Sequence, residues 1–549
     1  SRGRTVTQNT DVAVLPGLYL ELGDALFERL VGNFAIAVWD PRSRRVVLGR
    51  DRAGERHLLY RRSRDRVLFS SELAALTAGV PAPLQRDTGA LCDFIVDGFF
   101  AVPRTPYRDV SKLAPGECVV IDAGGERRRR YWRWNMGVAK TRAPDEQRFD
   151  EIFRRAVRRQ TDVDVDFGIL LSGGIDSSLI AAVSRQVRPD ARPTAYTVRF
   201  RESSYDEGGP ADEVAASLGL RCEPAWLSAE EVPDILEEMV RVTGEPIADP
   251  ALIPHTHLCR RAARDVRLVL GGEGADELFG GYPTHLGAVC AGVYSHTPGF
   301  VRRPFESIVR RWPVSDRKVT LSFLLKRFIA GVDLDGVVRH RLWTSVLSPE
   351  TLASLGLGQA NGAAGSLAVE DLPGGVLDRV QRYDFEGPLA ERLLIKADRG
   401  GMLSGLELRA PFLDRDVIEF AAALPPGARV SRLQTKVFLK RYARRYLPRS
   451  ITHRRKRGLS VPIASWLRGP LQDWARDRLA NSGLGDIGIR EDRALALLDA
   501  HLARTEDYSR GLWTLLVVAE WLRTTAAAVS SERPAGVIPA AAAPGRAAR

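Results

Sequence analysis

Short apolar segments, each bounded by charged or turn residues, occur throughout the first quarter of the chain. They lie at Asn33–Asp40, Arg44–Asp51 and Asp65–Leu73. This pattern is typical of β-strands. A longer pattern from Cys118 to Trp134 predicts a β-hairpin that turns at Asp122–Gly125. A charged, proline-containing stretch follows at Ala139–Gln147, so we predict a β-rich unit over residues 1–138.

Beyond this stretch, helical periodicity alternates with short apolar runs. The runs lie at Phe167–Ser172, Thr194–Phe200 and Val266–Gly272, after a first helical pattern at Phe149–Gln160. Strands that alternate with helices predict a parallel sheet covered by helices on both faces. Such sheets bind their ligands at the carboxyl ends of the strands. We assign residues 145–528 to this second, α/β domain.

Three further segments complete the pattern. The region from about Gly287 to Leu377 mixes apolar helices with a small-residue stretch, and we expect a loop insertion there. The apolar run Leu512–Leu522 is too short to span a bilayer and predicts a buried helix. Residues 529–549 are of low complexity and are expected to form a disordered tail.

Composition narrows the functional classes. The chain has 549 residues, 44% hydrophobic and 27% charged, as in a soluble protein of two or three domains. Its five cysteines show no CxxC spacing, which argues against a zinc ribbon or a secreted disulfide scaffold and favours the cytoplasm. No apolar run follows a basic stretch at the N-terminus, so we expect neither a signal peptide nor a membrane partner. The net charge of +12 comes mostly from dispersed arginines, so we expect a phosphate-rich small substrate rather than nucleic acid.

The segment FGILLSGGIDSSLIAAV, from Phe167 to Val183, carries the first chemical signal. A strand runs into Ser172, Gly173 and Gly174, and a helix then opens with Asp176 and Ser177. Glycines let a backbone curl closely around a ligand, and the amides at a helix start face an anion. The segment therefore predicts a phosphate-binding cradle.

This cradle is not of the Walker type, because the loop has no lysine. A carboxylate beside a polyphosphate is tolerable when Mg²⁺ lies between them, which gives Asp176 a role. The alternative is that Asp176 only caps the helix.

A second segment, VLGGEGADELFGGY from Val269 to Tyr282, repeats the pattern. Glycines at 271, 272 and 274 follow a strand and are interleaved with acids at 273, 276 and 277. These acids would repel a phosphate without a metal, so we expect Asp176 and Asp276 to hold one Mg²⁺. A third segment, Thr452–Leu467, places Lys456 in a basic cluster. A lysine at a nucleotide site can stabilise a developing oxyanion, although a surface patch is the simpler interpretation for this segment alone.

Together these motifs resemble the asparagine synthetase family, of the glutamine-hydrolysing, PP-loop ATP pyrophosphatase type. Further resemblance lies in VRFRESSYDEGGPADEVAASLG, GEPIADPALIP, LLIKADRGGMLSGLELRAPFLDRDVIEF and KVFLKRYARRYLP. It covers about residues 10 to 525. It implies a partial N-terminal-nucleophile amidotransferase-like αββα sandwich followed by a PP-loop doubly wound parallel-sheet domain.

The resemblance also implies an activity. Members of the family activate a carboxylate on the α-phosphate of ATP, release pyrophosphate, and let a nitrogen nucleophile displace AMP. The implied partners are ATP, Mg²⁺, a small carboxylate such as aspartate, and ammonia. The oligomeric state stays open, with a homodimer as the assembly considered.

The family's functional positions can be transferred residue by residue. Asp176 and Asp276 fall on the metal positions. Glu273 falls on the acid that promotes the intermediate and deprotonates ammonia, and Lys456 on the lysine that stabilises both transition states. The positions that bind ATP or pyrophosphate are Leu171, Ser172, Gly173, Gly174, Asp176, Ser177, Val198, Gly271 and Gly272. The β-lactam-forming branch has tyrosine where this chain has Glu273, which favours the ammonia-using branch.

The N-terminal unit resembles only the second half of the amidotransferase domain. Position 1 is serine and the first cysteine is Cys92. We therefore carry over no glutaminase residue, and expect either a truncated start or a protein that does not hydrolyse glutamine. On the chain as given, we expect turnover with ammonia but not with glutamine.

Three other functions stay open. A macrolactam cyclase of the lasso-peptide type would use the same adenylation with an internal amine, and the Gly287–Leu377 region could hold a peptide. A tRNA-modifying enzyme also uses SGGxDS, but the second motif counts against it. A non-catalytic binding protein is disfavoured because Asp176 and Glu273 are both present.

Overall fold

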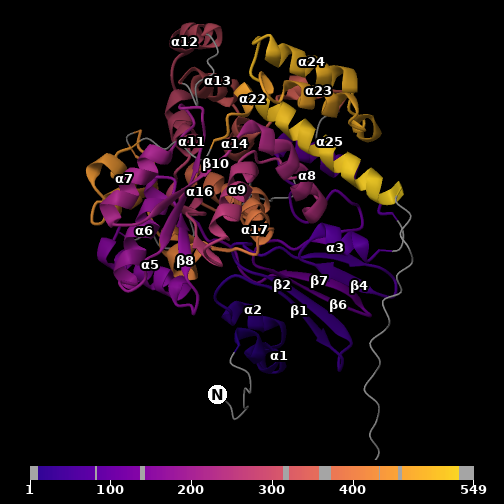
Figure 1. Cartoon of the computed structure of the whole chain (residues 1–549), viewed down its shortest axis with the longest axis vertical. Coiled ribbons are helices and arrows are strands. Elements are labelled where there is room, and N and C mark those ends of the chain that lie inside the picture. Colours follow the sequence, from indigo (N-terminus) through magenta and orange to yellow (C-terminus); the bar gives the residue numbers. More distant parts are fainter. Residues whose placement is uncertain are drawn as a thin grey trace, which may run out of the picture.

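The computed structural model describes residues 10–80, 83–136, 143–312, 321–357, 373–431, 433–454 and 460–530. Within them the chain forms three sheets surrounded by helices (Figure 1). Two antiparallel sheets make up the N-terminal unit, which is drawn in indigo at the bottom of the view. One parallel sheet organises the remainder.

The larger N-terminal sheet has the order β1-β2-β6-β7 and the smaller has the order β4-β3-β5. Their bounds are Ala35–Asp40 for β1, Arg45–Arg50 for β2, Leu59–Arg62 for β3, Val67–Ser70 for β4, Ser111–Lys112 for β5, Glu117–Asp122 for β6 and Gly125–Arg130 for β7. Asp122 pairs with Gly125, so Ala123 and Gly124 form a two-residue turn. The hairpin predicted between Cys118 and Trp134 is confirmed.

Side-chain alternation along these strands builds the sandwich. Val47 and Val120 point to one face, where they pack on Phe27 of helix α2 (Leu26–Arg29) and on Tyr19 of helix α1 (Leu15–Leu22). Their neighbours Leu48, Val119 and Ile121 point to the other face. There they meet Tyr60 of the second sheet and Leu58 and Leu113, which adjoin its strands β3 and β5. Because successive side chains of a strand point to opposite faces, one run of valines and leucines serves both layers. The predicted layered amidotransferase-like fold is confirmed.

The third sheet is parallel and has the order β10-β9-β8-β11-β12. Its strands are β8 (Phe167–Leu170), β9 (Thr194–Arg199), β10 (Cys222–Trp226), β11 (Leu268–Leu270) and β12 (Glu407–Arg409). The chain first builds outward from β8 to β10 and then returns to place β11 on the other side of β8. The switch point of this doubly wound sheet therefore lies between β8 and β11.

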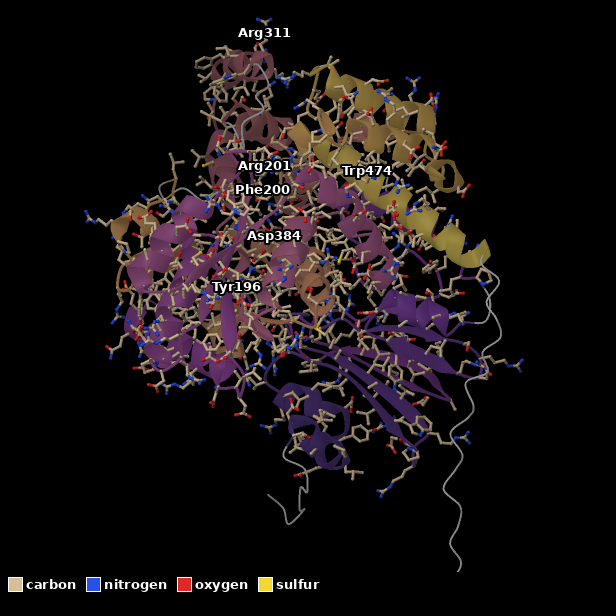
Figure 2. The ribbon with its side chains drawn as sticks, viewed as in Figure 1. Tyr196, Phe200, Arg201, Arg311, Asp384 and Trp474 are labelled. Atoms are coloured by element: carbon tan, nitrogen blue, oxygen red, sulfur yellow. The ribbon has the colours of Figure 1, made fainter. Side chains whose placement is uncertain are left out.

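Helices cover both faces of the parallel sheet, as the sequence predicts. Leu268 and Leu270 pack on helices α5 (Glu146–Thr161) and α6 (Ile175–Val187), whereas Val269 packs on α9 (Leu252–Ala262) and α17 (Leu394–Met402). Tyr196, on β9, belongs to the second of these clusters and is labelled in Figure 2. The α/β prediction is confirmed.

The region that the sequence left hard to interpret is largely helical. It contains α11 (Pro283–Tyr294), α12 (Gly299–Arg311), α13 (Leu321–Gly331), α14 (Gly336–Thr344) and α15 (Pro349–Ser354), and α16 (Val376–Asp384) follows it. The small-residue stretch expected to be a loop insertion falls on residues 358–372, outside the described residues.

The apolar run Leu512–Leu522 lies buried inside helix α25 (Ser509–Ser530), as predicted. This helix packs on α8 (Val232–Thr243), whose residues share its apolar cluster. It continues through residues 529 and 530, whereas the remainder of the expected tail, 531–549, lies outside the described residues. Among the residues that are described, no helix is both long and apolar enough to cross a membrane.

Candidate active site

A cavity of about 800 Å³ opens at the switch point of the parallel sheet. Its walls include the loops that follow β8 and β11, which are neighbouring strands. Cavities at this position of an open α/β sheet are the usual ligand sites of the architecture. The two glycine-rich motifs found in the sequence are thus brought to one place.

The loop after β8 is shaped by a glycine and two serines. Gly173 has φ +68°, and a Cβ on it would lie 2.5 Å from the carbonyl carbon of Pro210. The Ser172 and Ser177 hydroxyls lie 3.2 Å apart, and the Gly174 N–H donates to the Ser172 hydroxyl at 3.3 Å. Helix α6 starts directly afterwards, so its positive end faces the cavity. This arrangement can bind an anion such as a phosphate.

The loop after β11 lies against the first loop. A Cβ on Gly272 would come 3.2 Å from the Cβ of Asp176, so the two loops touch at this point. Glu273 folds back over Gly271, where any side chain would overlap its carboxylate. Within the described part of the chain, the buried Oε2 of Glu273 has no hydrogen-bond partner. A buried, unpaired carboxylate oxygen in a cavity is available to a ligand.

Lys436 joins the acids of the two loops. Its Nζ lies 2.6 Å from both carboxylate oxygens of Asp176 and 2.7 Å from Oδ1 of Asp276. The side chain is only 2% exposed, and its backbone adopts φ +53°, a strained value for lysine. Burial lowers the pKa of Lys436, and the Asp176 carboxylate opposes this effect. The two acids thus converge on one positive charge.

Gly281 makes this convergence possible, because a Cβ there would overlap the Asp276 carboxylate and the Lys436 side chain. Asp276 and Glu277 belong to the short helix α10 (Ala275–Phe279), which the loop after β11 positions. Glu277 is buried, accepts a hydrogen bond from the Tyr282 hydroxyl at 2.5 Å, and has a pKa raised by burial to about 7. This carboxyl is thus protonated more readily than an ordinary glutamate.

Further cations line the cavity near the first loop. Lys440 lies one helical turn after Lys436, and its pKa is lowered by burial and by the charge of Lys436. Arg454 pairs with Glu213 at 2.6 Å and donates to the carbonyl oxygen of Gly173 at 3.5 Å. Positive groups around a glycine loop suit a ligand that carries several negative charges.

The other end of the cavity is formed by α9, by α17 and by the helix segment before α17. Lys396 lies 3.8 Å from Asp249, and both line the cavity together with His255. The His255 ring contacts the Ala397 carbonyl oxygen at 3.2 Å, and burial lowers the pKa of His255 to about 4. His255 is therefore neutral near pH 7.

A buried hydrogen-bonded cluster fixes the helices that follow Tyr282 in the chain. The rings of His285 on α11 and His340 on α14 bond to Asp384 of α16 at 2.7 and 2.8 Å (Asp384 is labelled in Figure 2). Burial alone would raise the pKa of Asp384, but the two histidines hold it well below its usual value. The cluster ties three helices together beside the cavity.

The structure gathers most of the residues selected from the sequence. Eleven of them line this cavity: Leu171, Ser172, Gly173, Gly174, Asp176, Ser177, Val198, Gly271, Gly272, Glu273 and Asp276. Lys456 lies in residues 455–459, outside the described part of the chain. Lys436, Lys440 and Lys396 also line the cavity, but the sequence motifs did not predict them as site residues. The four-residue spacing of Lys436 and Lys440 at the start of helix α20 (Val437–Ala443) is the signal that could have identified the first two.

Comparisons with known proteins agree with this arrangement. The asparagine synthase family model matches residues 148–523, and the glutamine amidotransferase domain model matches residues 1–132. A putative glutamine-hydrolysing asparagine synthetase of Mycobacterium tuberculosis (strain ATCC 25618 / H37Rv) is 31% identical, over 94% of this chain and 80% of the relative. Asparagine synthetase [glutamine-hydrolyzing] 1 of Bacillus subtilis is 28% identical, over 95% of this chain and 82% of the relative. Amidase chry2 of Gibberella zeae is 23% identical, over 88% and 77%.

Proposed function

The chain belongs to the asparagine synthase family, and from this premise we propose that its cavity adenylates a small carboxylic acid with ATP and converts it to an amide. Family membership makes the protein an amide-forming ligase that uses ATP. The acid, the metal and the roles of individual residues form the proposal. One observation carries it: Asp176 and Asp276, from two loops that are about 100 residues apart in the sequence, both contact the Lys436 ammonium beside a glycine-rich helix start.

ATP binds in the proposal with its phosphates against the loop Ser172–Ser177. The N–H groups at the start of α6 and the serine hydroxyls donate to phosphate oxygens. Lys436, Lys440 and Arg454 neutralise further negative charge. The substrate carboxylate oxygen attacks the α-phosphorus, the bond to the β-phosphate breaks, and pyrophosphate leaves with its electron pair.

The two carboxylates fit a magnesium ion. Carboxylate oxygens are the ligands that Mg²⁺ prefers, and the ion usually keeps waters and phosphate oxygens in its remaining positions. Asp176 and Asp276 already share one positive charge, so their placement suits a bound cation. Mg²⁺ held by these two residues would supply charge neutralisation to the departing pyrophosphate.

Glu273 is the proposed base of the second half-reaction. Its Oε2 is buried in the cavity wall and, among the described residues, has no hydrogen-bond partner. A carboxylate in this position can take a proton from the attacking ammonia as its nitrogen bonds to the acyl carbon and AMP leaves. Lys456 is proposed to stabilise the oxyanion of that step.

A small acid suits the cavity better than a folded peptide. The cavity volume, about 800 Å³, lies within the roughly 300–1,000 Å³ range of small-molecule sites, and ATP takes a large share of it. Lys396 and Asp249 form the polar part of the opposite end, and Leu389 and Leu393 the apolar part. This favours amidation of a metabolite over macrolactam formation.

ATP–pyrophosphate exchange tests the proposal. Radiolabelled pyrophosphate is incubated with the protein, ATP and Mg²⁺ across a panel of carboxylic acids, of which L-aspartate is the first. Ammonia or glutamine is then added, and amide is measured by mass spectrometry. We expect exchange that depends on one acid of the panel and amide formation with ammonia. If none of the acids in the panel gives pyrophosphate exchange, the proposal is contradicted.

A further inference from the structure

The last residue of β2, Arg50, and the loop Asp51–His57 that follows it form a hydrogen-bonded element of the N-terminal unit. The Asp51 carboxylate accepts hydrogen bonds at 2.7–3.1 Å from the backbone N–H groups of Ala53, Gly54, Glu55 and Arg56. Gly54 has φ +76°, and a Cβ on it would lie 2.8 Å from the Arg50 guanidinium. The loop is therefore folded around two buried side chains of opposite charge.

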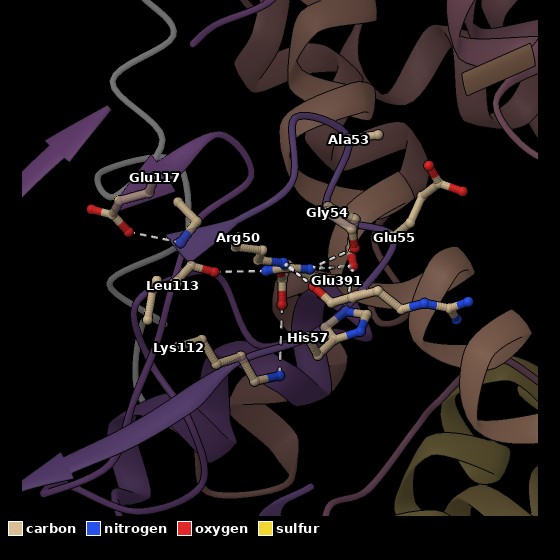
Figure 3. Close-up of polar contacts among 12 residues, drawn as sticks. Arg50, Ala53, Gly54, Glu55, His57, Lys112, Leu113, Glu117 and Glu391 are labelled. Atoms are coloured by element: carbon tan, nitrogen blue, oxygen red, sulfur yellow. Dashed lines mark hydrogen bonds and ion pairs between the residues drawn. The ribbon is translucent and has the colours of Figure 1, made fainter. Parts of the chain in front are cut away.

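The Arg50 guanidinium is fully buried and makes five hydrogen bonds (Figure 3). Three go to carbonyl oxygens of its own unit: Arg56 at 2.9 Å, Leu113 at 2.6 Å and Gly54 at 2.8 Å. The other two cross to the synthetase unit, to the Glu391 carboxylate at 2.7 Å and the Ala390 carbonyl oxygen at 3.4 Å. Every N–H direction of the planar fork is used, a geometry that lysine cannot reproduce.

Two neighbouring side chains strengthen the same contact. The His57 ring lies 2.9 Å from the Ala390 carbonyl oxygen, and burial holds the pKa of His57 well below its usual value, so the ring is neutral. The Lys112 ammonium lies 3.6 Å from Glu391 and 2.9 Å from Glu245. All of these charged side chains are at most 3% exposed. The N-terminal unit thus binds two consecutive residues of the other unit, Ala390 and Glu391.

Ala390 and Glu391 lie in an irregular helix, η5 (Phe385–Leu393). This helix has π-helical hydrogen bonding and contains Gly387 and Pro388. Proline removes a backbone donor and glycine adds conformational freedom, so such a helix depends on outside contacts for its shape. Leu389 and Leu393 lie on either side of Ala390 and Glu391 in the sequence, and both line the cavity. Lys396, one turn later, also lines it. One side of η5 therefore contacts the N-terminal unit and another side forms the cavity wall.

We infer that Arg50, through its ion pair with Glu391, is a positioning residue for the cavity. Through this contact the N-terminal unit holds η5, which forms part of the cavity wall, in place. Amide formation therefore depends on the contact even when free ammonia is the nitrogen donor. The effect on catalysis rests on the proposed function, whereas the placement of η5 by Arg50 does not. Breaking a buried ion pair leaves the other charge unpaired, so the contact is either made or lost. Loss of the Arg50–Glu391 contact moves the cavity wall near Lys396 and Asp249, where the acid is proposed to bind. It leaves the loop Ser172–Ser177, where the phosphates are proposed to bind, unchanged.

The test compares the parent chain, residues 1–549, with Glu391→Gln and Arg50→Lys. Arg129→Met is the matched control, because Arg129 lies in the same N-terminal unit but pairs with Glu28 at the surface. Ammonia is the nitrogen donor, and the acid is the one that gives the fastest pyrophosphate exchange in the parent. We expect Glu391→Gln to lower kcat/KM for this acid by about tenfold, mainly through a higher KM, with the Kd of ATP within about twofold of the parent. Arg50→Lys keeps the charge but loses the fork, and is expected to fall between the parent and Glu391→Gln.

Hydrogen exchange followed by mass spectrometry supplies the second measurement, which does not need activity. The backbone amides of residues 385–393 are expected to exchange about tenfold faster in Glu391→Gln and to be unchanged in Arg129→Met. An unchanged rate at residues 385–393 in a folded variant overturns the inference, and so does an unchanged KM for the acid. If Glu391→Gln does not fold, Arg50→Lys decides by the same two measurements. A parent that shows no exchange with any acid contradicts the proposed function, and the hydrogen-exchange result then decides the placement of η5.

Discussion

At the scale of single residues, the site depends on where two carboxylates and one ammonium meet. Asp176 and Asp276 each lie two residues after a glycine of their own loop, and Lys436 reaches them from a third segment of the chain. The sequence predicts both acids, because each sits in a recognisable strand-loop-helix pattern. Lys436 is a lysine before an ordinary helical pattern, and only the fold shows that its side chain is buried between the acids.

Asp176→Ala removes half of this acidic pair. We expect pyrophosphate exchange to fall by about a thousandfold or more, because the departing diphosphate loses the carboxylate that holds its counter-charge. The exposed Asp190, after helix α6, provides the control, and Asp190→Ala should exchange at the parent rate. Parent-like exchange in folded Asp176→Ala protein would refute the role given to Asp176.

Glu273→Gln keeps the shape of the side chain and removes its basicity. ATP should bind with the parent Kd. Pyrophosphate exchange should fall because Glu273 is also expected to promote formation of the acyl-adenylate, and amide yield should fall by about a hundredfold or more because the carboxylate that takes a proton from ammonia is lost. Calorimetry measures the Kd of ATP, and product analysis measures the amide yield. Glu230→Gln, at an exposed position, is the control. Normal amide yield would assign the base to another residue.

His255 predicts a pH dependence of stability. Burial lowers the pKa of His255 to about 4 in the folded protein, whereas an exposed histidine titrates near 6.5. Below about pH 6.5 the unfolded chain therefore takes up a proton that the folded chain does not, and His255 alone destabilises the fold by about 2 kcal/mol at pH 5 relative to pH 7. Part of the acid lability of the protein should come from this residue.

His255→Gln should reduce the loss of melting temperature between about pH 7 and about pH 5. The comparison uses the difference between the two pH values, so that any constant effect of the substitution cancels. The exposed His296→Gln should keep the parent difference. An equal loss in His255→Gln and the parent would contradict a neutral, buried His255.

At the scale of elements, regular periodicity was predictable and irregular backbone was not. The hairpin, the alternation of strands and helices, and the buried helix α25 all follow from simple patterns of apolar residues. Helix η5 does not, because Gly387 and Pro388 in its middle indicate a break rather than a helical segment. Its shape is set by Arg50 and His57 of the other unit, which are more than 300 residues away in the chain.

The phosphate loop gives a prediction at this scale. Gly173 combines a positive φ with close contact to Pro210, so Gly173→Ala must shift the loop. We expect the Kd of ATP, measured by calorimetry, to rise by about tenfold or more. The neighbouring Gly209 has open space where a Cβ would lie, and Gly209→Ala should bind ATP like the parent. Unchanged affinity in Gly173→Ala would place the phosphates elsewhere.

At the scale of the whole molecule, the two units form one structure. The largest apolar cluster contains Leu73 and Phe94 from the N-terminal unit, and Leu236 and Trp521 from α8 and α25. The Tyr107 and Trp521 rings lie 5.8 Å apart across the same boundary. Sequence patterns show which residues are apolar, but not which partner they meet, so the joined core could not be predicted.

The order of the parallel sheet explains why the candidate residues gather. Outward growth from β8 to β10 followed by a return to β11 puts the two glycine loops side by side. The sequence alone predicts two similar loops at strand ends, and the resemblance to a family supplies their shared role. The fold adds the adjacency, the cavity and the third segment that carries Lys436.

The central claim is that Asp176 and Asp276 together hold one divalent cation against the leaving pyrophosphate. Anomalous scattering from Mn²⁺ tests it most directly, in crystals grown with a non-hydrolysable ATP analogue whose α,β bridge is methylene. We expect one manganese peak within bonding distance of both carboxylates and of the β-phosphate, at about 2 Å for oxygen ligands. A bound nucleotide whose manganese lies away from either carboxylate would contradict it.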